Sequence, residues 1–175
     1  GFLQITPTSD FDGAIIISIK SVTAVSTPLL VFTNSSGAIS AEIRNPCGAS
    51  PTGLIDTNIF IGVNAGCYNT TGYNNIIIGK LAGYTNSTGY NNAFIGSITG
   101  YTNSTGWYNT FIGHAAGYSN TTGYTNTFIG GNSGYNNSTG YNNMFLGYGA
   151  GYNNSTGYQN TFIGRSAGQS TTGNN

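Results

Sequence analysis

Residues 109–125, N-T-F-I-G-H-A-A-G-Y-S-N-T-T-G-Y-T, are one copy of a unit that repeats along most of this chain. Variants of the unit follow one another every 17 residues from Asn58 onward, and its fifth position is always glycine. These glycines are Gly62, Gly79, Gly96, Gly113, Gly130, Gly147 and Gly164. Self-similarity at a short fixed period is typical of proteins in which each unit packs against its two neighbours. The repeat therefore predicts a solenoid over residues 58–175.

The length and composition of the unit select the kind of solenoid. Seventeen residues are too few for a helical hairpin, and Gly, Asn and Thr are poor helix formers. Each unit holds a short β-prone run, such as 109–112, closed by Gly113, and a polar stretch, such as 118–122, between two further glycines. We predict an all-β fold: a parallel β-roll of seven 17-residue coils, with two short strands and two glycine turns in each coil.

The composition excludes several classes of function. Gly, Asn, Thr and Ser make up just over half of the 175 residues, charged residues make up 5%, and the formal net charge is zero. Nucleic-acid binding needs a basic surface, so no nucleic-acid partner is expected. A membrane-spanning helix needs roughly 20 apolar residues, so no membrane span is expected either. The aromatic content of 13% favours a packed chain over a disordered one.

Residues 1–57 differ from the repeats and contain all four acidic residues of the chain. Two runs, 14–20 and 29–33, are predicted strands, and turn signals follow at 34–37 and 45–53. The segment is too small for a robust independent domain. We therefore expect a β-rich segment over 1–57 that caps the solenoid, pairs with another subunit, or does both.

The third and fourth positions of the unit are both apolar throughout. The third position holds Phe60, Ile77, Phe94, Phe111, Phe128, Phe145 and Phe162. The fourth holds Ile61, Ile78, Ile95, Ile112, Ile129, Leu146 and Ile163. Neighbours on a strand point to opposite faces, so one row fills the coil and the other faces outward.

We expect the phenylalanine row to be the outward one, buried between copies of the chain. Its self-association residues would be Phe94, Phe111, Phe128, Phe145 and Phe162. Such a row exposes too much apolar surface to stay in water. The alternatives are that residues 1–57 cover the row, or that a local bulge turns both rows inward.

Six units contain an N-x-T sequence in the loop. Its asparagines are Asn69, Asn86, Asn103, Asn120, Asn137 and Asn154. The motif makes them candidate N-glycosylation sites on a solvent-facing loop. The alternative is an unmodified ladder, because stacked Asn side chains hydrogen-bond along a solenoid.

The loops also carry an aromatic row that is a candidate ligand-binding stripe. It consists of Tyr73, Tyr90, Trp107, Tyr124, Tyr141 and Tyr158. Exposed Tyr and Trp side chains bind sugars or partner surfaces, whereas stacked ones are mainly structural. A second row consists of Tyr84, Tyr101, Tyr118, Tyr135 and Tyr152.

The repeats lack the residues that common enzymes need. Residues 58–175 contain no acidic side chain, and the single histidine, His114, shares a variable position of the unit with Lys80 and Arg165. A catalytic triad needs an acid to orient the histidine, and a glycosidase needs two opposed carboxylates. We expect this variable position to face solvent, and we expect no catalytic residue, metal or cofactor.

Each of the two parts of the chain contains one cysteine. Cys47 lies in the N-terminal segment, and Cys67 takes a position in the first unit that is Tyr in the next five. We predict a Cys47–Cys67 disulfide and an oxidising, extracellular setting. Two free cysteines, or cysteines paired between chains, remain the alternative.

The stretches N-T-F-I-G-H-A-A-G (109–117) and N-T-F-I-G-R-S-A-G (160–168) resemble the head repeats of trimeric autotransporter adhesins. Similar repeats occur in phage tail-fibre proteins. The adhesin repeats carry S-V-A-I-G followed by x-x-A-x-A in a left-handed parallel β-roll, so the resemblance implies a homotrimer. This unit is longer than the adhesin one, and its third position is Phe where the adhesins have a small residue.

Together these features predict a non-enzymatic, extracellular structural protein at a cell or virion surface. It would be the self-associating subunit of a β-solenoid fibre or adhesin, with itself as partner in a trimer or filament and a cell-surface glycan or receptor as a further partner. The alternative is a carbohydrate- or receptor-binding module of a phage tail fibre. Ice binding is a third hypothesis, disfavoured because only one Thr row is regular and Tyr residues flank it.

Overall fold

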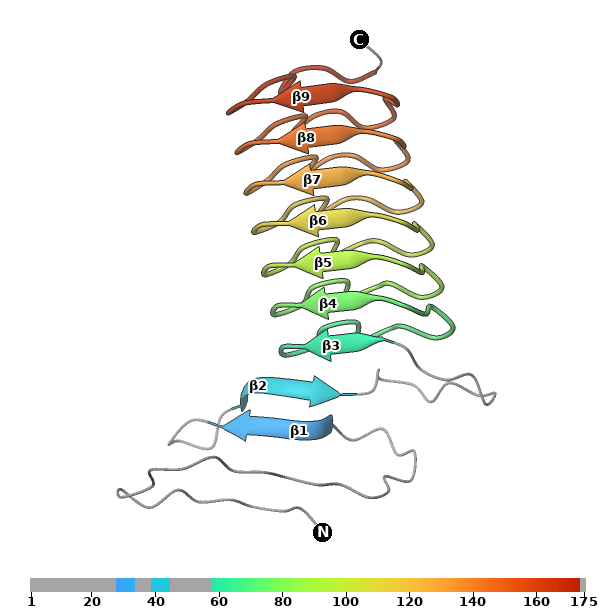
Figure 1. The fold of residues 1–175 in the computed structure, drawn as a ribbon, viewed down its shortest axis with the longest axis vertical. Coiled ribbons are helices and arrows are strands. Elements are labelled where there is room, and N and C mark those ends of the chain that lie inside the picture. Colours follow the sequence, from blue (N-terminus) through green and yellow to red (C-terminus); the bar gives the residue numbers. More distant parts are fainter. Residues whose placement is uncertain (1–27, 34–38, 45–57, 174–175) are drawn as a thin grey trace.

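A computed structural model describes residues 28–33, 39–44 and 58–173. Its regular elements there are β-strands in a single nine-stranded sheet, whose order follows the sequence (Figure 1). The strands are β1 (Pro28–Thr33), β2 (Ile39–Arg44), β3 (Ile59–Ile61), β4 (Ile76–Ile78), β5 (Ala93–Ile95), β6 (Thr110–Ile112), β7 (Thr127–Ile129), β8 (Met144–Leu146) and β9 (Thr161–Ile163).

Strands β3 to β9 form the predicted parallel β-solenoid. Each strand pairs with the equivalent residues one unit away, so that Phe111 of β6 lies between Phe94 of β5 and Phe128 of β7. The coils stack into a straight rod with β9 at its far end (Figure 1). The prediction of an all-β solenoid is confirmed.

One part of the coil differs from the prediction. Each coil contains a single three-residue strand, and the second stretch, 118–122 in the quoted unit, is made of turns and bends. Its backbone still links the coils, since the Ser119 N–H donates to the Tyr135 carbonyl at 2.9 Å. The backbone takes left-handed values nearby, at Gly117 (φ 59°) and Thr125 (φ 51°), and these bends prevent a regular strand.

At the other end of the sheet the chain adds a hairpin to the solenoid. β1 pairs with β2 antiparallel, and β2 pairs with β3 antiparallel through Ile43 and Ile61. β1 confirms the strand predicted over 29–33, whereas β2 was not predicted, because its sequence I-S-A-E-I-R interrupts the apolar positions with charges. The strand predicted over 14–20 lies outside the described residues.

The interior of the rod is a stack of rings. Phe94, Phe111, Phe128 and Phe145 have no exposed surface, and successive rings lie nearly parallel with centroids 4.7–5.0 Å apart. The wall facing them is made of small residues: glycine, together with alanine in most coils and Thr99 or Ser133 in two of them. A Cβ built on Gly117 would lie 2.5 Å from a ring carbon of Phe111. The recurring Ala-Gly pair of the unit therefore makes room for the rings.

Candidate interaction surface

The phenylalanine row does not form the outer surface. The predicted self-association residues Phe94, Phe111, Phe128 and Phe145 are fully buried within their own chain, and Phe162 of the last strand packs against that core. The prediction of an outward phenylalanine row is wrong. The space left by the small residues of the opposite wall takes a ring, and the aliphatic side chains that alternate with the rings must then point out.

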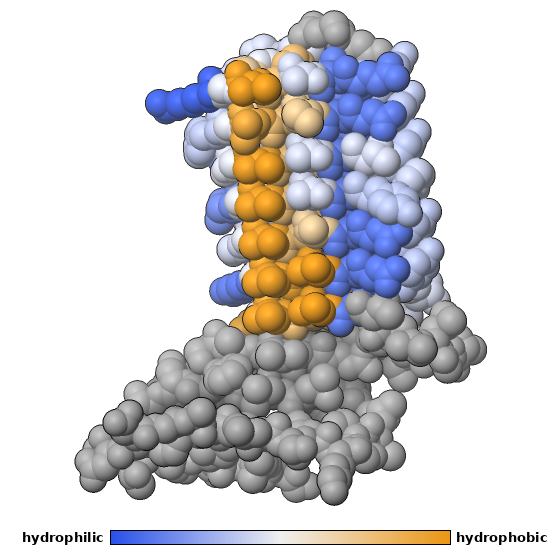
Figure 2. All heavy atoms as spheres, viewed as in Figure 1, coloured by the Kyte–Doolittle hydropathy of each residue, from blue (hydrophilic) through white to orange (hydrophobic). Residues whose placement is uncertain are grey.

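The outward row is instead the fourth position of the unit, which we name the aliphatic row. It consists of Ile61, Ile78, Ile95, Ile112, Ile129, Leu146 and Ile163. Its exposure reaches 38% at Ile95, 43% at Leu146 and 64% at Ile163. Figure 2 shows the row as a continuous orange band along the rod. Six coil spacings of ~4.8 Å make it roughly 29 Å long.

A second row on the same face, the second position of the unit, borders the aliphatic row. It is apolar at Ile59, Ile76 and Met144, which are 42–49% exposed, and small or hydroxyl-bearing in the other coils. No residue of β3 to β9 is charged. The strand face is therefore an uncharged, mostly apolar surface, of a size that soluble monomers rarely leave open.

Charged side chains lie just beyond the strands. Lys80, His114 and Arg165 are exposed, which confirms the expectation for their variable position. The guanidinium carbon of Arg165 lies 5.9 Å from the ring centroid of Tyr148. In the described residues, no three His, Cys, Asp or Glu side chains come together as a metal site would require.

The asparagines of the N-x-T motifs are inside the rod. Asn86, Asn103 and Asn120 have no exposed surface, and their side chains form a ladder. The Asn103 Nδ2 donates to Asn86 Oδ1 at 2.7 Å and to the Gly106 carbonyl at 3.1 Å. The expectation that this row faces solvent is wrong, and the alternative of a hydrogen-bonded ladder is confirmed.

The ladder links five of the six motif asparagines, from Asn69 to Asn137, through Nδ2–Oδ1 hydrogen bonds. At the sixth, the Asn154 Nδ2 donates to the Gly173 carbonyl instead, and among the described residues the Oδ1 atoms of Asn137 and Asn154 have no partner. Asn69, Asn86, Asn103, Asn120, Asn137 and Asn154 are all buried. A buried amide needs hydrogen-bond partners, and within the ladder they are an identical residue one coil away and the glycine carbonyl three residues further along the same coil. The folded rod therefore offers none of these side chains to a glycosyltransferase.

A second asparagine ladder opens each unit, and the sequence pattern gave no role to it. The Asn92 Oδ1 accepts from the Asn109 backbone N–H at 2.9 Å, and the Asn109 Nδ2 donates to the Gly123 carbonyl at 2.8 Å. Each such side chain fastens the start of one strand to a loop and to the next coil. The signal was the presence of Asn in all seven units.

The threonines of the N-x-T motifs do face solvent. They are Thr71, Thr88, Thr105, Thr122, Thr139 and Thr156, and all are exposed. Together they form a single hydroxyl row on the loop side of the rod.

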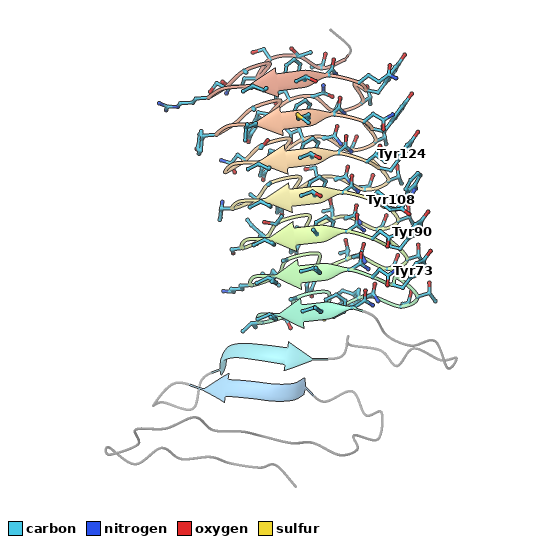
Figure 3. All side chains as sticks on the ribbon, in the orientation of Figure 1. Tyr73, Tyr90, Tyr108 and Tyr124 are labelled. Atoms are coloured by element: carbon cyan, nitrogen blue, oxygen red, sulfur yellow. The ribbon has the colours of Figure 1, made fainter. Side chains whose placement is uncertain are left out.

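The candidate ligand stripe is a stack. Successive rings from Tyr73 through Tyr90, Trp107, Tyr124 and Tyr141 to Tyr158 lie within 8° of parallel, with centroids 4.6–5.8 Å apart. Figure 3 shows labelled members of the row projecting from one side of the rod. The inner rings cover one another's faces, so they present edges and polar atoms outward. A sugar binds by stacking on the face of an aromatic ring. In the middle of the row these faces are covered by neighbouring rings, so they are not accessible to a sugar.

The second tyrosine row is also stacked and partly buried. Tyr84 lies 5.2 Å from Tyr101 in a parallel arrangement and meets Tyr68 edge to face at 5.0 Å. A hydrogen bond with Tyr68, followed by burial, raises the pKa of Tyr84 to about 12. Burial likewise raises the pKa of Tyr135.

Cys67 occupies the position of this tyrosine row in the first coil and is buried. Its predicted partner, Cys47, lies outside the described residues. The Cys47–Cys67 disulfide therefore stays a prediction.

These observations define the class of the protein: it is a β-solenoid repeat protein with a ring-stacked interior and an exposed aliphatic row. Comparison with known proteins found no matching family model, curated protein or solved structure. Among the described residues, no helix is long and apolar enough to cross a membrane.

Proposed function

We propose that this chain is a non-enzymatic structural subunit of an extracellular fibre or adhesin, and that copies associate side by side through the aliphatic row. The observation that carries the proposal is the unbroken, uncharged aliphatic row along all seven parallel strands. The two-faced strand demanded one outward apolar row. Because the phenylalanines are buried within each chain, the aliphatic side chains are the proposed contact between copies.

The geometry suits association of copies that lie parallel to one another. Parallel copies around a common axis bring each rung of the row against the same rung of a neighbour, which is self-complementary without any charge pairing. Full burial of one Ile or Leu side chain contributes roughly 1.5–3 kcal/mol. The free energy gained by burying seven partly exposed side chains on each copy is therefore comparable with the ~4–15 kcal/mol lost in association entropy. The resemblance to adhesin head repeats favours three copies.

The proposed extracellular location rests on the two cysteines. A disulfide between Cys47 and Cys67 would join the N-terminal segment to the first coil in an oxidising compartment. Intact-mass analysis after alkylation, with and without reductant, tests it. Two alkylated thiols in material purified without reductant would contradict the disulfide.

Cysteine cross-linking tests the side-by-side contact. Ile112→Cys lies on the aliphatic row, and Thr122→Cys is a matched exposed position on the loop side of the same coil. Under a mild oxidant, Ile112→Cys should give disulfide-linked dimers at low micromolar concentration and Thr122→Cys should not. Equal cross-linking of the two variants would contradict the proposed contact.

A further inference from the structure

One aromatic ring on the rod stands outside both aromatic rows. Tyr108 occupies the last position of the unit and is 54% exposed. Figure 3 labels it on the same side of the rod as Tyr90 and Tyr124. In the other described coils this position holds Asn74, Asn91, Thr125, Asn142 and Gln159. Tyr108 is therefore a single added ring and not a member of a repeated row.

The faces of this ring are not covered in the way that the rows cover their own members. The ring centroid of Tyr108 lies 5.4 Å from that of Trp107 and 5.9 Å from that of Tyr90, with interplanar angles of 75° and 73°. Trp107 and Tyr90 are themselves within 2° of parallel. Tyr108 thus lies beside this stacked pair and nearly perpendicular to it. Since the adjacent coils hold Asn91 and Thr125 at its position, no ring among the described residues stacks parallel on Tyr108.

The backbone at Tyr108 shows that the fold does not select this side chain. Its φ is 53°, in the left-handed region, which disfavours most residues and which asparagine tolerates best after glycine. Asparagine fills the equivalent position in three of the other five coils, with φ values of 54–55°. A tyrosine kept in an unfavourable backbone conformation, with half of its surface in solvent, points to a role in binding.

The residues around Tyr108 provide hydrogen-bonding groups on both sides of the ring. Asn91 and Thr125 lie at the same position one coil away in each direction, at the coil spacing of ~4.8 Å. An asparagine amide both donates and accepts. The Thr125 hydroxyl donates to Asn142 Oδ1, and its oxygen can still accept. A pyranose ring needs these two features together: an aromatic face for its C–H groups and amide or hydroxyl partners for its hydroxyls.

Charge selects the kind of sugar. In residues 58–173 the cationic side chains are Lys80 and Arg165, each two residues past the end of its strand, whereas Tyr108 lies two residues before the start of β6. Cations and platform are therefore at opposite ends of the strands. The surroundings of Tyr108 offer no cation to pair with a carboxylate or sulfate group, so they favour a neutral sugar.

We propose that Tyr108, flanked by Asn91 and Thr125, is a binding site for a neutral pyranose of a glycan, with the sugar stacked on the tyrosine ring. The site is separate from the side-by-side contact of the proposed function and does not depend on it. It also differs from the stacked row of Tyr90 and Trp107, which supports the Tyr108 ring from one side.

The test uses the full chain and the methyl β-glycosides of glucose, galactose and N-acetylglucosamine. Saturation-transfer NMR should detect binding of at least one of them, and methyl β-glucuronide should bind more weakly. Trp107 is the only tryptophan, so its fluorescence reports on this site during titration. Tyr108→Asn installs the residue of three other coils, so it should melt at or above the temperature of the parent. It should nevertheless lower the affinity for the sugar at least about tenfold.

Two controls separate the site from other parts of the rod. Tyr148→Asn removes a ring of similar exposure, 57%, that lies near Arg165, and should bind the sugar as the parent does. The double variant Ile112→Asp/Ile129→Asp disables the side-by-side contact and should also keep its affinity, so the two proposals fail independently. The proposal is overturned if none of the three neutral glycosides binds, or if Tyr108→Asn binds as the parent does. Loss of association between copies in Tyr108→Asn, with sugar binding unchanged, would assign the ring to a protein contact instead.

Discussion

Phe111 and Ile112 are consecutive residues of β6 that lie on opposite sides of the coil wall: Phe111 is fully buried in the ring stack, and Ile112 is 36% exposed on the aliphatic row. The same inversion holds in the neighbouring coils, where Phe128 and Phe145 are buried and Leu146 is exposed. The two residues look alike in the sequence, because both are apolar, but they have different roles in the structure. The ring stabilises the coil, and the aliphatic side chain is available for contacts between copies.

Truncating each member of this pair should have different effects. Phe111→Ala empties a fully packed site and should lower the free energy of unfolding by about 3–5 kcal/mol. Ile112→Ala removes a half-exposed side chain and should cost the isolated rod less than about 1 kcal/mol. Urea unfolding followed by circular dichroism, at concentrations that prevent association, measures both. Similar losses for the two variants would contradict the assignment of inside and outside.

Two glycines of neighbouring units give a matched test of how closely the coils approach. A Cβ at Gly123 would collide with the Asn120 side-chain oxygen and the Gly140 carbonyl. One at Gly131 would lie 3.3 Å from the ring of Tyr148 and 4.0 Å from the His114 carbonyl oxygen. Gly123→Ala should therefore cost about 1–3 kcal/mol, and Gly131→Ala should stay within about 0.5 kcal/mol of the parent. Thermal unfolding compares them, and an unaffected Gly123→Ala variant would refute the close packing.

N-glycans should be absent from the rod even when it is secreted by a cell that attaches them. Asn86, Asn103 and Asn120 are fully buried and use their amides in the ladder. Peptide mapping before and after treatment with a glycan-releasing amidase should find these residues unmodified. A glycan on any of the three would mean that the ladder is open at that coil.

High pH should destabilise the rod through Tyr84. Its pKa is raised from 10.0 to about 12 by the hydrogen bond with Tyr68 and by burial. The folded state thus favours the neutral phenol, so the stabilisation is complete below pH 10 and is lost as the pH rises through about 12. Absorbance at 295 nm, taken as the difference between parent and Tyr84→Phe, follows this ionisation. Tyr68→Phe should lower the pKa of Tyr84, and an unchanged midpoint would rule out the hydrogen bond as its cause.

The architecture could be predicted from the 17-residue period because a fixed spacing leaves few ways to stack units. Which of two adjacent apolar rows faces inward could not be predicted from alternation alone, since Phe111 and Ile112 satisfy it in either orientation. The orientation is decided by residues on the opposite side of the coil, such as Ala116 and Gly117, whose small size provides the space for a ring. Those residues are far enough along the unit that their pairing with the strand depends on the path of the turns.

The roles of the asparagines were hidden for a related reason. The N-x-T motif is defined by local sequence, whereas the ladder that buries Asn103 depends on Asn86 and Asn120, each 17 residues away. The missed strand β2 is held by pairing with β1 and β3 and not by an apolar pattern of its own. Long-range pairing overrides local propensity at both places.

Sedimentation velocity of the parent chain beside the Ile112→Asp/Ile129→Asp variant tests whether the aliphatic row joins copies side by side. Both substitutions place a charge on the outer face of the rod, where it faces solvent in an isolated copy and should not disturb the fold. The parent should sediment as a species larger than the 18.1-kDa chain, and the variant, with an unchanged β-type circular dichroism spectrum, should lose that lateral association. A parent that stays monomeric at all concentrations, or a variant that assembles as the parent does, would contradict the account.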